Sequence, residues 1–386
     1  MTERLYYSDS YLRSFRAQVL EVAEDGLTVY LDRTAFYPAS GGQPADAGSI
    51  AGRAVVDVVD EGERIAHRLS APLAAGAADC AIDWERRFDH MQQHSGQHLL
   101  SAVFSETFAL HTVSFHLGAE SATIDLEGPA VEPRTVVEAE RRANALVFEN
   151  RPLTVEFEDA AAASGLRKAS EREGTLRIVS IADLDRSACG GTHVRSTGEI
   201  GPILLRKLEK VRDATRVEFV CGGRAVRRAR ADFDALTAAA QLFSVSLDDL
   251  PAAAGAHLEA ARTADKARRK LELDLAAFQG RELHAATVPG ADGLRRHTRR
   301  LERGALDELR ALAQSFTAGP KAVFVAALND PPSVLLAASA DSGIDAGKIL
   351  KAAITGAGGR GGGNARIAQG SVGSRESLDQ VLGKLG

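Results

Sequence analysis

The chain has 386 residues, 45% of them hydrophobic, which is enough for two or three domains with cores of their own. Its 47 Lys and Arg against 52 Asp and Glu give a net charge of −5, which excludes an overall basic coat for nucleic acid but allows a local patch. Three cysteines, Cys80, Cys189 and Cys221, are too few for a disulfide scaffold, so we expect reduced or metal-bound thiols and a cytoplasmic location. No basic-then-apolar leader and no long apolar run are present, which predicts no membrane anchor.

The N-terminal half predicts two domains. In residues 1–83, short stretches rich in Val, Leu and Ile alternate with Gly, Pro and Asp turns at hairpin spacing, which indicates a small antiparallel β-domain of barrel-like form. From Trp84 to about Phe104 the apolar residues follow a helical period, and further strand and helix signals continue to about residue 220. Residues 84–223 are therefore expected to form an α+β domain.

The C-terminal half predicts a helical segment and a further small domain. Residues 224–287 are rich in helix formers and are broken once, at Leu250-Pro251, which predicts two long helices and a surface for dimerisation. In residues 288–386, apolar runs at 322–327 and 334–338 predict strands, and a helix is expected near 345–354 before a glycine cluster. The whole chain is expected to be of the α+β class.

Three histidines at a spacing of four residues, His90, His94 and His98, indicate a metal site. Side chains four residues apart lie on the same face of a helix, so an adjacent pair can hold one ion. His90 and His98 are two turns apart, about 12 Å along the helix axis, so one ion takes only one adjacent pair. The spacing alone does not decide between the two pairs.

A second cluster, Cys189-Gly190-Gly191-Thr192-His193, adds a thiolate and an imidazole and completes a four-ligand set of the kind that zinc prefers. Zinc metalloproteases place Glu after the first histidine of their helical pair, whereas Ser95 follows His94, so peptide hydrolysis by that route is disfavoured. Four protein ligands would close the site, and three would leave a position for water or substrate. The sequence leaves both arrangements open.

Four blocks carry a resemblance to a known family. They are Thr34–Pro44, Arg87–Leu100, Cys189–His193 and Gly358–Gly363. In this order the first three resemble blocks of the alanyl-tRNA editing proteins and of the editing region of alanyl-tRNA synthetases, and the fourth is similar to the glycine motif of the synthetase C-terminal domain. The resemblance covers nearly the whole chain.

The resemblance implies one zinc ion per chain, bound by His94, His98, Cys189 and His193. It implies an aminoacyl-tRNA deacylase that removes serine, and glycine as a further substrate, from tRNA(Ala). The β-domain begins almost at Met1, without the activation domains of a synthetase, so we expect a free-standing hydrolase and not a complete ligase. Many relatives have Thr-Ala where this chain has Ser95-Gly96, which leaves the detail of the pocket open.

The first block supplies candidate catalytic residues by the same resemblance. Thr34 and Gln43 are candidates to recognise the hydroxyl or amine of the amino acid, and N–H groups near Gly41 and Gly42 are candidates to stabilise the oxyanion. The alternative is that this block is only a glycine turn between strands. Gln97 lies beside His98 in the metal motif, where it faces either the pocket rim or solvent.

Two basic regions are candidates for RNA binding. Residues 201–230 contain nine basic residues against three acidic ones, and Lys207, Arg212 and Arg224 are the candidates chosen from them. The alternative is a solvated surface with dispersed charge. The C-terminal glycine cluster, with Arg360 and Arg366, is a second candidate for phosphate contacts, and a flexible loop without a ligand is its alternative.

Two other classes of function compete with the deacylase. A metal-dependent phosphoesterase acting on short oligonucleotides would need an Asp-His-His motif and clustered aspartates, whereas Asp89-His90-Met91 stands here. A non-catalytic tRNA-binding protein with a closed structural zinc site would bind RNA without turnover.

Overall fold

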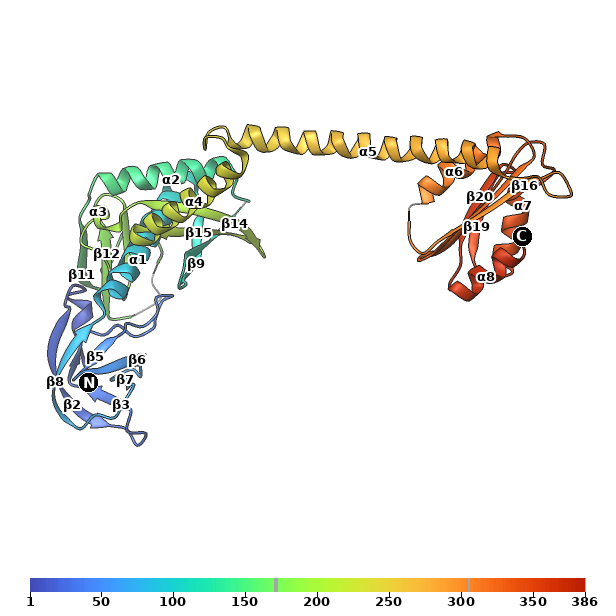
Figure 1. Ribbon diagram of the computed structural model, residues 1–386. Coiled ribbons are helices and arrows are strands. Elements are labelled where there is room, and N and C mark those ends of the chain that lie inside the picture. Colours follow the sequence, from blue (N-terminus) through green and yellow to red (C-terminus); the bar gives the residue numbers. More distant parts are fainter. Residues whose placement is uncertain (129, 170–172, 305, 386) are drawn as a thin grey trace. The chain divides into compact units, whose positions relative to one another are not determined.

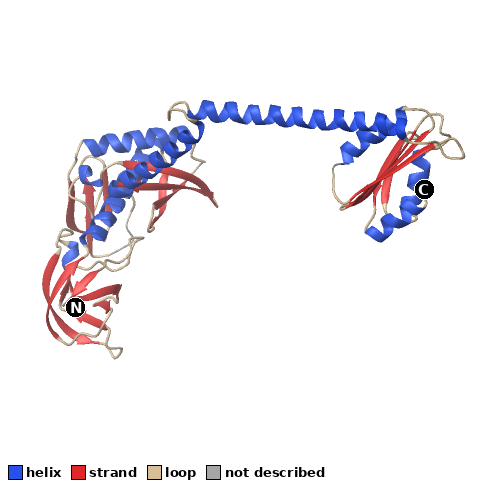
Figure 2. Cartoon of the chain, viewed as in Figure 1, coloured by secondary structure: helices blue, strands red, loops and turns tan. Residues whose placement is uncertain are grey.

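The protein is described by a computed structural model that covers residues 1–128, 130–169, 173–304 and 306–385 (Figure 1). The chain divides into two compact units, Met1–Ala238 and Ala239–Gly386. The mixed α+β class expected from the sequence is confirmed, with helices and strands in both units (Figure 2). Among the described residues, no helix combines the length and apolar character needed to cross a bilayer.

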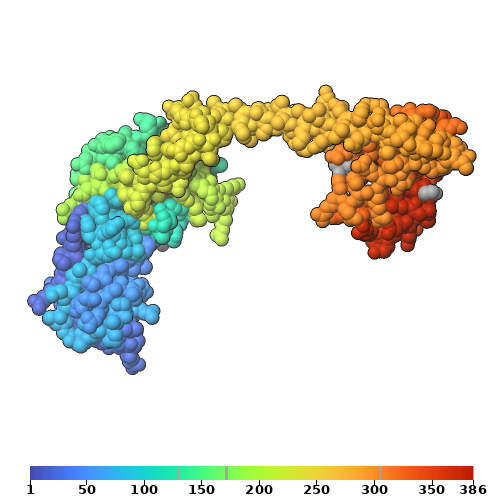
Figure 3. Space-filling model, in the orientation of Figure 1, coloured from blue at the N-terminus to red at the C-terminus, as the bar shows by residue number. Residues whose placement is uncertain are grey.

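A closed six-stranded barrel forms the N-terminal part of the first unit, as the hairpin spacing predicts. Its strands, in their order around the barrel, are β2 (Ser14–Val22), β3 (Thr28–Leu31), β7 (Ile65–Leu69), β6 (Arg53–Asp60), β5 (Gly48–Ile50) and β8 (Gly76–Ile82). Every pair is antiparallel, and alternate side chains fill the interior, which is why period-2 patterning reveals these strands. The space-filling view shows the barrel as a solid surface on the face drawn (Figure 3). The short strands β1 (Glu3–Arg4) and β4 (Arg33–Thr34) pair in parallel, and the 3-10 turn η1 (Leu5–Tyr7) follows β1.

Helix α1 (Trp84–Phe108) carries the predicted histidine motif and leads out of the barrel. Asp83 caps its N-terminus by accepting a hydrogen bond from the Arg86 N–H at 3.2 Å, and Ala109 ends it in the left-handed conformation. Arg87 forms a fully buried ion pair with Asp46 of the segment after β4. This pair fixes α1 against the segment that contains the Thr34–Pro44 block.

Two antiparallel sheets pack around α1. The first contains β14 (Ile203–Val211), β15 (Ala214–Cys221), β10 (Ala122–Glu127) and β9 (His111–Leu117), in that order, and the second contains β11 (Leu153–Asp159), β12 (Thr175–Ile181) and β13 (Asp185–Ala188). The remaining helices are α2 (Pro133–Phe148), α3 (Thr197–Ile200) and α4 (Gly222–Phe243). One hydrophobic core joins side chains of α1, α2 and both sheets, so the motif helix is held from several sides.

The second unit is a five-stranded sheet covered by helices on both faces. The strand order is β16 (Arg295–Leu301), β17 (Ala322–Asn329), β18 (Pro332–Ala338), β20 (Ile367–Ser371) and β19 (Arg360–Gly363). The helices are α5 (Leu250–Ala286), α6 (Leu306–Ala318), α7 (Ala346–Thr355) and α8 (Arg375–Gly383). Alternate residues of β17 and β18 pack either with α7 and α8 or with α5 and α6.

Two local features differ from the sequence expectation. The helical break lies between Phe243 and Leu250, and Pro251 belongs to the first turn of α5, where its missing N–H costs no hydrogen bond. Part of the glycine cluster is strand β19, paired with β20, and not a loop. A Cβ on Gly361 would lie 2.7 Å from the Gln369 carbonyl oxygen, so close strand packing requires glycine there.

Candidate metal centre

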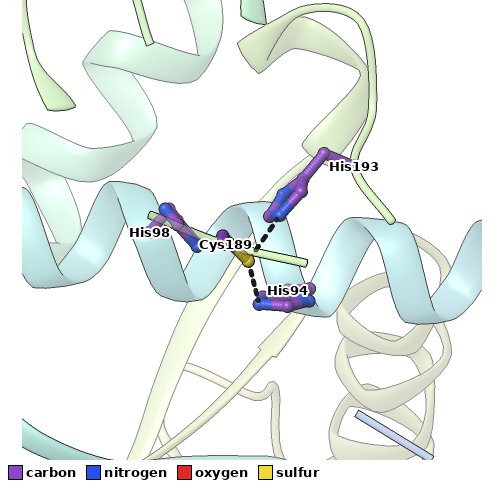
Figure 4. Close-up of side chains that lie close together, drawn as sticks. All are labelled: His94, His98, Cys189 and His193. Carbon is purple, nitrogen blue, oxygen red and sulfur yellow. Dashed lines mark hydrogen bonds between the residues drawn. The ribbon is translucent and has the colours of Figure 1, made fainter. Parts of the chain in front are cut away.

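Four side chains from two distant parts of the chain meet beside α1 (Figure 4). His94 and His98 project from one face of α1, Cys189 directly follows β13, and His193 lies in the segment between Cys189 and α3. One nitrogen or sulfur atom from each of the four lies within 4.8 Å of all the others. The structure thus brings together the four residues that the family resemblance implied.

The spacing fits a single tetrahedral cation. Cys189 Sγ lies 3.5 Å from His94 Nε2 and 3.3 Å from His193 Nε2. Around zinc, with bonds of about 2.0–2.3 Å to nitrogen and sulfur, tetrahedral geometry places ligand atoms about 3.3–3.8 Å apart. Two of the spacings therefore match tetrahedral zinc, and the four residues offer the nitrogen and sulfur donors that the group implied by the family resemblance prefers.

Two of the imidazoles are oriented by side chains on their outer nitrogen. His94 Nδ1 donates to Gln43 Oε1 at 2.8 Å, and Gln43 in turn donates from Nε2 to Thr192 Oγ1 at 2.8 Å. His98 Nδ1 lies 2.9 Å from Asp185 Oδ2. Such partners fix the tautomer and turn Nε2 toward a metal. Asp185 was not a candidate from the sequence, because a lone aspartate near a strand end has no distinguishing pattern.

Ser95 orients the third imidazole. Its Oγ lies 3.1 Å from His193 Nδ1 and accepts the Val194 N–H at 3.2 Å. The residue that stands in place of the metalloprotease glutamate is thus buried behind the cluster and contacts one of its imidazoles. All three histidines consequently present Nε2 to the centre.

The pKa values of Cys189 and His193 suit a metal centre. Burial raises the pKa of the Cys189 thiol, but the neighbouring His94 and His193 outweigh burial and hold this pKa well below its usual range, which favours the thiolate that binds metal. Burial lowers the pKa of His193 to about 3, so this ring is neutral near pH 7. Burial would also lower the pKa of His98, but its hydrogen bond to Asp185 raises it to about 9.

His90, the third histidine of the motif, is not part of the cluster among the described residues. Its side chain is buried, and burial lowers its pKa to about 4. The spacing argument allowed His90–His94 or His94–His98, and the structure brings the second pair to Cys189 and His193.

The cluster lines a cavity of about 950 Å³ in the first unit. His94, His98 and Cys189 contribute to its wall, together with Gly41 of the first block and Gln97 of the metal motif. Phe157, 54% exposed, and Val113, 50% exposed, also lie along it. A ligand that enters this cavity therefore meets both apolar and polar surface beside the cluster.

The other candidate catalytic residues are divided between the cavity wall and the layer behind it. Gln97 faces the cavity and donates from Nε2 to Ser101 Oγ at 2.8 Å. Gln43 lies behind His94 and does not line the cavity. Gly42 has a φ of +84°, and a Cβ there would lie 2.5 Å from the Phe115 carbonyl oxygen, so its role in packing is evident.

Thr34 lies in the interior of the barrel. Its Oγ1 is 2.8 Å from His67 Nε2 and accepts the Phe36 N–H at 3.1 Å. It is not among the described residues that line the cavity. This position gives no support to its expected role as a recogniser of the amino acid.

The candidate RNA-binding residues differ in exposure. Lys207 and Arg212 are exposed on the hairpin of β14 and β15, and Arg360 and Arg366 are exposed in the second unit. Arg224 is buried instead, and its guanidinium binds the Asp89 carboxylate at 2.6 Å and the Gly118 carbonyl at 2.8 Å. The placement of Arg224 gives no support to an RNA contact, because each of its three guanidinium nitrogens already donates to Asp89 or Gly118.

Comparison with known proteins supports the resemblance. A family described as "Threonyl and Alanyl tRNA synthetase second additional domain" matches residues 176–216, which include Cys189 and His193. The "Alanyl-tRNA editing protein AlaX-L" of Pyrococcus horikoshii is 38% identical over 59% of this chain and 60% of its own length. The "Alanine--tRNA ligase" of Pyrococcus furiosus is 31% identical over 100% of this chain and 44% of its own length.

The fold and the site thus define a mixed α+β protein with a histidine and cysteine cluster suited to metal. The resemblance of this chain to alanyl-tRNA editing proteins and to a part of alanyl-tRNA synthetases is confirmed. The chain spans about half the length of these curated relatives. A solved structure, the C-Ala domain from Aquifex aeolicus alanyl-tRNA synthetase, matches 24% of this chain and 87% of that chain, with 23% identity and a TM-score of 0.22. So low a TM-score adds nothing on the fold.

Proposed function

We propose that this protein is a trans-editing hydrolase that removes wrongly attached serine, and also glycine, from tRNA(Ala). The observation that carries the proposal is the cluster of His94, His98, Cys189 and His193, of which the first three line a cavity of about 950 Å³. The editing protein among its relatives supports the same activity. We propose that one zinc ion per chain occupies the cluster and that the chain does not activate alanine.

The chemical need for such an activity is well defined. A synthetase pocket sized for alanine cannot exclude the smaller glycine, and it rejects serine poorly because serine only adds a hydroxyl. Differences of this size give about 10- to 200-fold discrimination, so a second, hydrolytic site is required. A site that hydrogen-bonds the serine hydroxyl disfavours alanine by about 10⁴-fold, because alanine leaves its polar groups unpaired.

We assign different roles in the proposed hydrolysis to the residues around the cavity. When bound, zinc would hold these four side chains together and supply a positive charge that helps to position the substrate. Gln43, Ser95 and Asp185 hold the three imidazoles in place from behind. Because four protein ligands close the site, we assign the attack to a water molecule that is oriented by polar groups of the cavity or by the terminal ribose hydroxyl.

The turn after β4 supplies the groups that face the developing negative charge. Hydrogen bonds between Ser40 and Gln43, at 3.0 and 2.9 Å, close this turn and use neither the Gly41 nor the Gly42 N–H. Gly41 lines the cavity, and we assign to these two N–H groups the stabilisation of the ester oxyanion. Gln97 donates from Nε2 to Ser101, and we assign its Oε1 to the hydroxyl or amine of the amino acid.

We further propose that exposed basic side chains bind the tRNA, namely Lys207, Arg212, Arg360 and Arg366. Substitution of a side chain that binds a phosphate should reduce the salt dependence of RNA binding.

We also propose a homodimer through residues 224–287, supported by the exposed apolar side chains of Leu271, Leu275 and Phe278 on α5. Sedimentation that shows a concentration-independent monomer would exclude the dimer. The three free thiols support a cytoplasmic location.

The test compares three esters of tRNA(Ala), carrying serine, glycine or alanine, with the wild type and with Cys189→Ala. We expect the wild type to hydrolyse the serine ester selectively and Cys189→Ala to lose this activity. Cys80→Ala is the matched control, because Cys80 is equally a free thiol but is buried in the barrel core. Serine and glycine esters that stay as stable as in buffer would refute the proposal, and RNA binding without turnover would favour the non-catalytic zinc protein.

A further inference from the structure

Arg177 of β12 is a buried cation whose hydrogen bonds go only to carbonyl groups. The residue is 8% exposed. Its Nε donates to the Tyr7 carbonyl at 2.9 Å and its Nη1 to the Cys189 carbonyl at 2.6 Å. The third nitrogen, Nη2, is buried and has no partner among the described residues. No carboxylate of the described chain lies within ion-pair distance of this guanidinium.

The other buried arginines of the described chain show what is missing. Arg87 is paired with the Asp46 carboxylate, and Arg224 is paired with Asp89. Burial of a guanidinium without an anion is costly, and burial lowers the pKa of Arg177 accordingly. An unpaired guanidinium of this kind in the wall of a cavity indicates an anionic ligand.

The unpaired guanidinium of Arg177 lies beside the metal cluster. Arg177 lines the same cavity, and the residue whose carbonyl it binds, Cys189, supplies the sulfur of the cluster. The carboxylates nearby are already used: Asp60 pairs with Arg4 at 2.8 Å, and Asp185 binds His98. A divalent ion held by one thiolate and three neutral imidazoles would carry a net positive charge, so it would not supply the anion either.

A second unpartnered group lies in the same wall. Tyr6 is 1% exposed, lines the cavity, and its hydroxyl has no hydrogen-bond partner among the described residues. The ring of Tyr7 connects the two groups: its centroid lies 4.7 Å from that of Tyr6 and 5.7 Å from Arg177 Cζ. One hydroxyl and one guanidinium NH₂ group in residues of this wall are thus buried and lack a hydrogen-bond partner among the described residues.

We infer that Arg177 and Tyr6 form a subsite for the phosphodiester group of the terminal nucleotide of an aminoacylated RNA. This inference rests on the proposed function and deepens it. When the ester lies at the cluster, only the ribose separates it from the phosphate of the same nucleotide. Cys189 likewise joins the cluster and Arg177, because its sulfur belongs to the cluster and its carbonyl accepts a hydrogen bond from Arg177. A planar guanidinium is the side chain best suited to phosphate oxygens, and a hydroxyl adds a further donor.

The test uses analogues that cannot be hydrolysed. Serine is joined by an amide to the 3′ position of 3′-amino-3′-deoxyadenosine, and this compound is prepared with and without a methyl phosphate at the 5′ position. Calorimetry measures the dissociation constants of both with the intact, zinc-loaded protein. We expect the wild type to prefer the phosphorylated analogue by about 10- to 100-fold, the usual range for a charge-assisted hydrogen bond.

Two variants of Arg177 test whether this residue causes the preference for the phosphorylated analogue. Arg177→Gln should bind both analogues equally. Arg177→Lys should keep part of the preference, because lysine keeps the positive charge but lacks the planar guanidinium that binds two phosphate oxygens at once. Arg4→Lys is the matched control, because Arg4 lines the same cavity but already has the Asp60 carboxylate. Its preference should equal that of the wild type. Thermal unfolding and zinc content show which variants remain folded.

Three results would overturn the inference: equal affinity of the wild type for the two analogues, no binding of the phosphorylated analogue at millimolar concentration, or an unchanged preference in folded Arg177→Gln. If Arg177→Gln does not fold, the inference is still tested by the preference of the wild type for the phosphorylated analogue and by the preference of Arg177→Lys. The analogues contain no ester, so the result is independent of turnover. A phosphate preference in a protein that leaves Ser-tRNA(Ala) intact would refute the proposed hydrolysis and retain the subsite.

Discussion

Gly190 and Gly191 are neighbours in sequence, yet the structure predicts opposite results when each is changed to alanine. A Cβ on Gly191 would lie 2.2 Å from His94 Cε1 and 2.4 Å from His94 Nδ1, whereas a Cβ on Gly190 would lie 3.6 Å from its nearest neighbour, Tyr7 Cε1. Nonbonded carbon atoms pack at about 3.5–4.0 Å. Gly191→Ala must therefore move the His94 ring by more than about 1 Å, and Gly190→Ala requires no movement.

The cost follows from what holds His94. Its ring is hydrogen-bonded to Gln43 at 2.8 Å and stacked on Phe115 with centroids 5.3 Å apart, so a shift disturbs both contacts. Overpacking of this kind costs about 1–3 kcal/mol of stability. Disturbing the partner that orients a metal ligand lowers metal affinity about 10- to 100-fold.

The assay is a competition for zinc between each variant and a chelator, combined with thermal unfolding of the zinc-loaded protein. Gly191→Ala should bind zinc at least about tenfold more weakly than Gly190→Ala, which should match the wild type. Equal zinc affinity of the two variants would refute the placement of His94 against Gly191. Metal affinity is the readout because both glycines also line the cavity and either change can affect substrate.

Three further predictions concern residues around the cluster and in the barrel. Asp185→Asn should lower zinc affinity about 10- to 100-fold in the same competition assay, because the carboxylate orients His98. Gly96→Ala should cost about 1–3 kcal/mol in chemical denaturation, since its Cβ would lie 2.3 Å from Cys221 Sγ, and Cys221→Ala should restore most of this loss. Burial lowers the pKa of His67 to about 4 in the folded protein, so the unfolded chain binds the proton first, and up to about 3 kcal/mol of stability should be lost as pH falls from about 6.5 to 4.

Each of these has a contrary outcome. Unchanged zinc affinity in Asp185→Asn would mean that His98 is held by other contacts. Additive losses in the double variant Gly96→Ala, Cys221→Ala would show that the two residues do not share one space. A His67→Gln variant that loses stability over the same pH range as the wild type would assign the acid sensitivity to other groups.

The barrel and the C-terminal strands could be predicted because their burial patterns are local. Period-2 patterning and turn residues at hairpin spacing are visible without knowing what lies opposite. The glycine cluster could not be assigned in this way, because the need for glycine at Gly361 arises from the Gln369 carbonyl of the neighbouring strand. The same holds for Gly96, whose missing side chain is explained by Cys221, 125 positions further along the chain.

Part of the site was equally accessible from the sequence. The spacing of the histidines and the Cys189–His193 segment indicated a metal site, but the spacing left two histidine pairs open, and the set of four residues came from the family resemblance. Asp185 and Arg177 were missed, since a single carboxylate or guanidinium acquires meaning only from its neighbours in space. Thr34 was assigned by its block, and the sequence could not show that its hydroxyl lies 2.8 Å from His67 Nε2 in the barrel.

X-ray absorption spectroscopy at the zinc edge, on protein purified without chelator, tests the central claim most directly. One zinc per chain is expected, with one sulfur at about 2.3 Å and three nitrogens at about 2.0–2.1 Å, and with the sulfur shell absent in Cys189→Ala. Protein that contains no zinc, or a zinc shell without sulfur in the wild type, would contradict it.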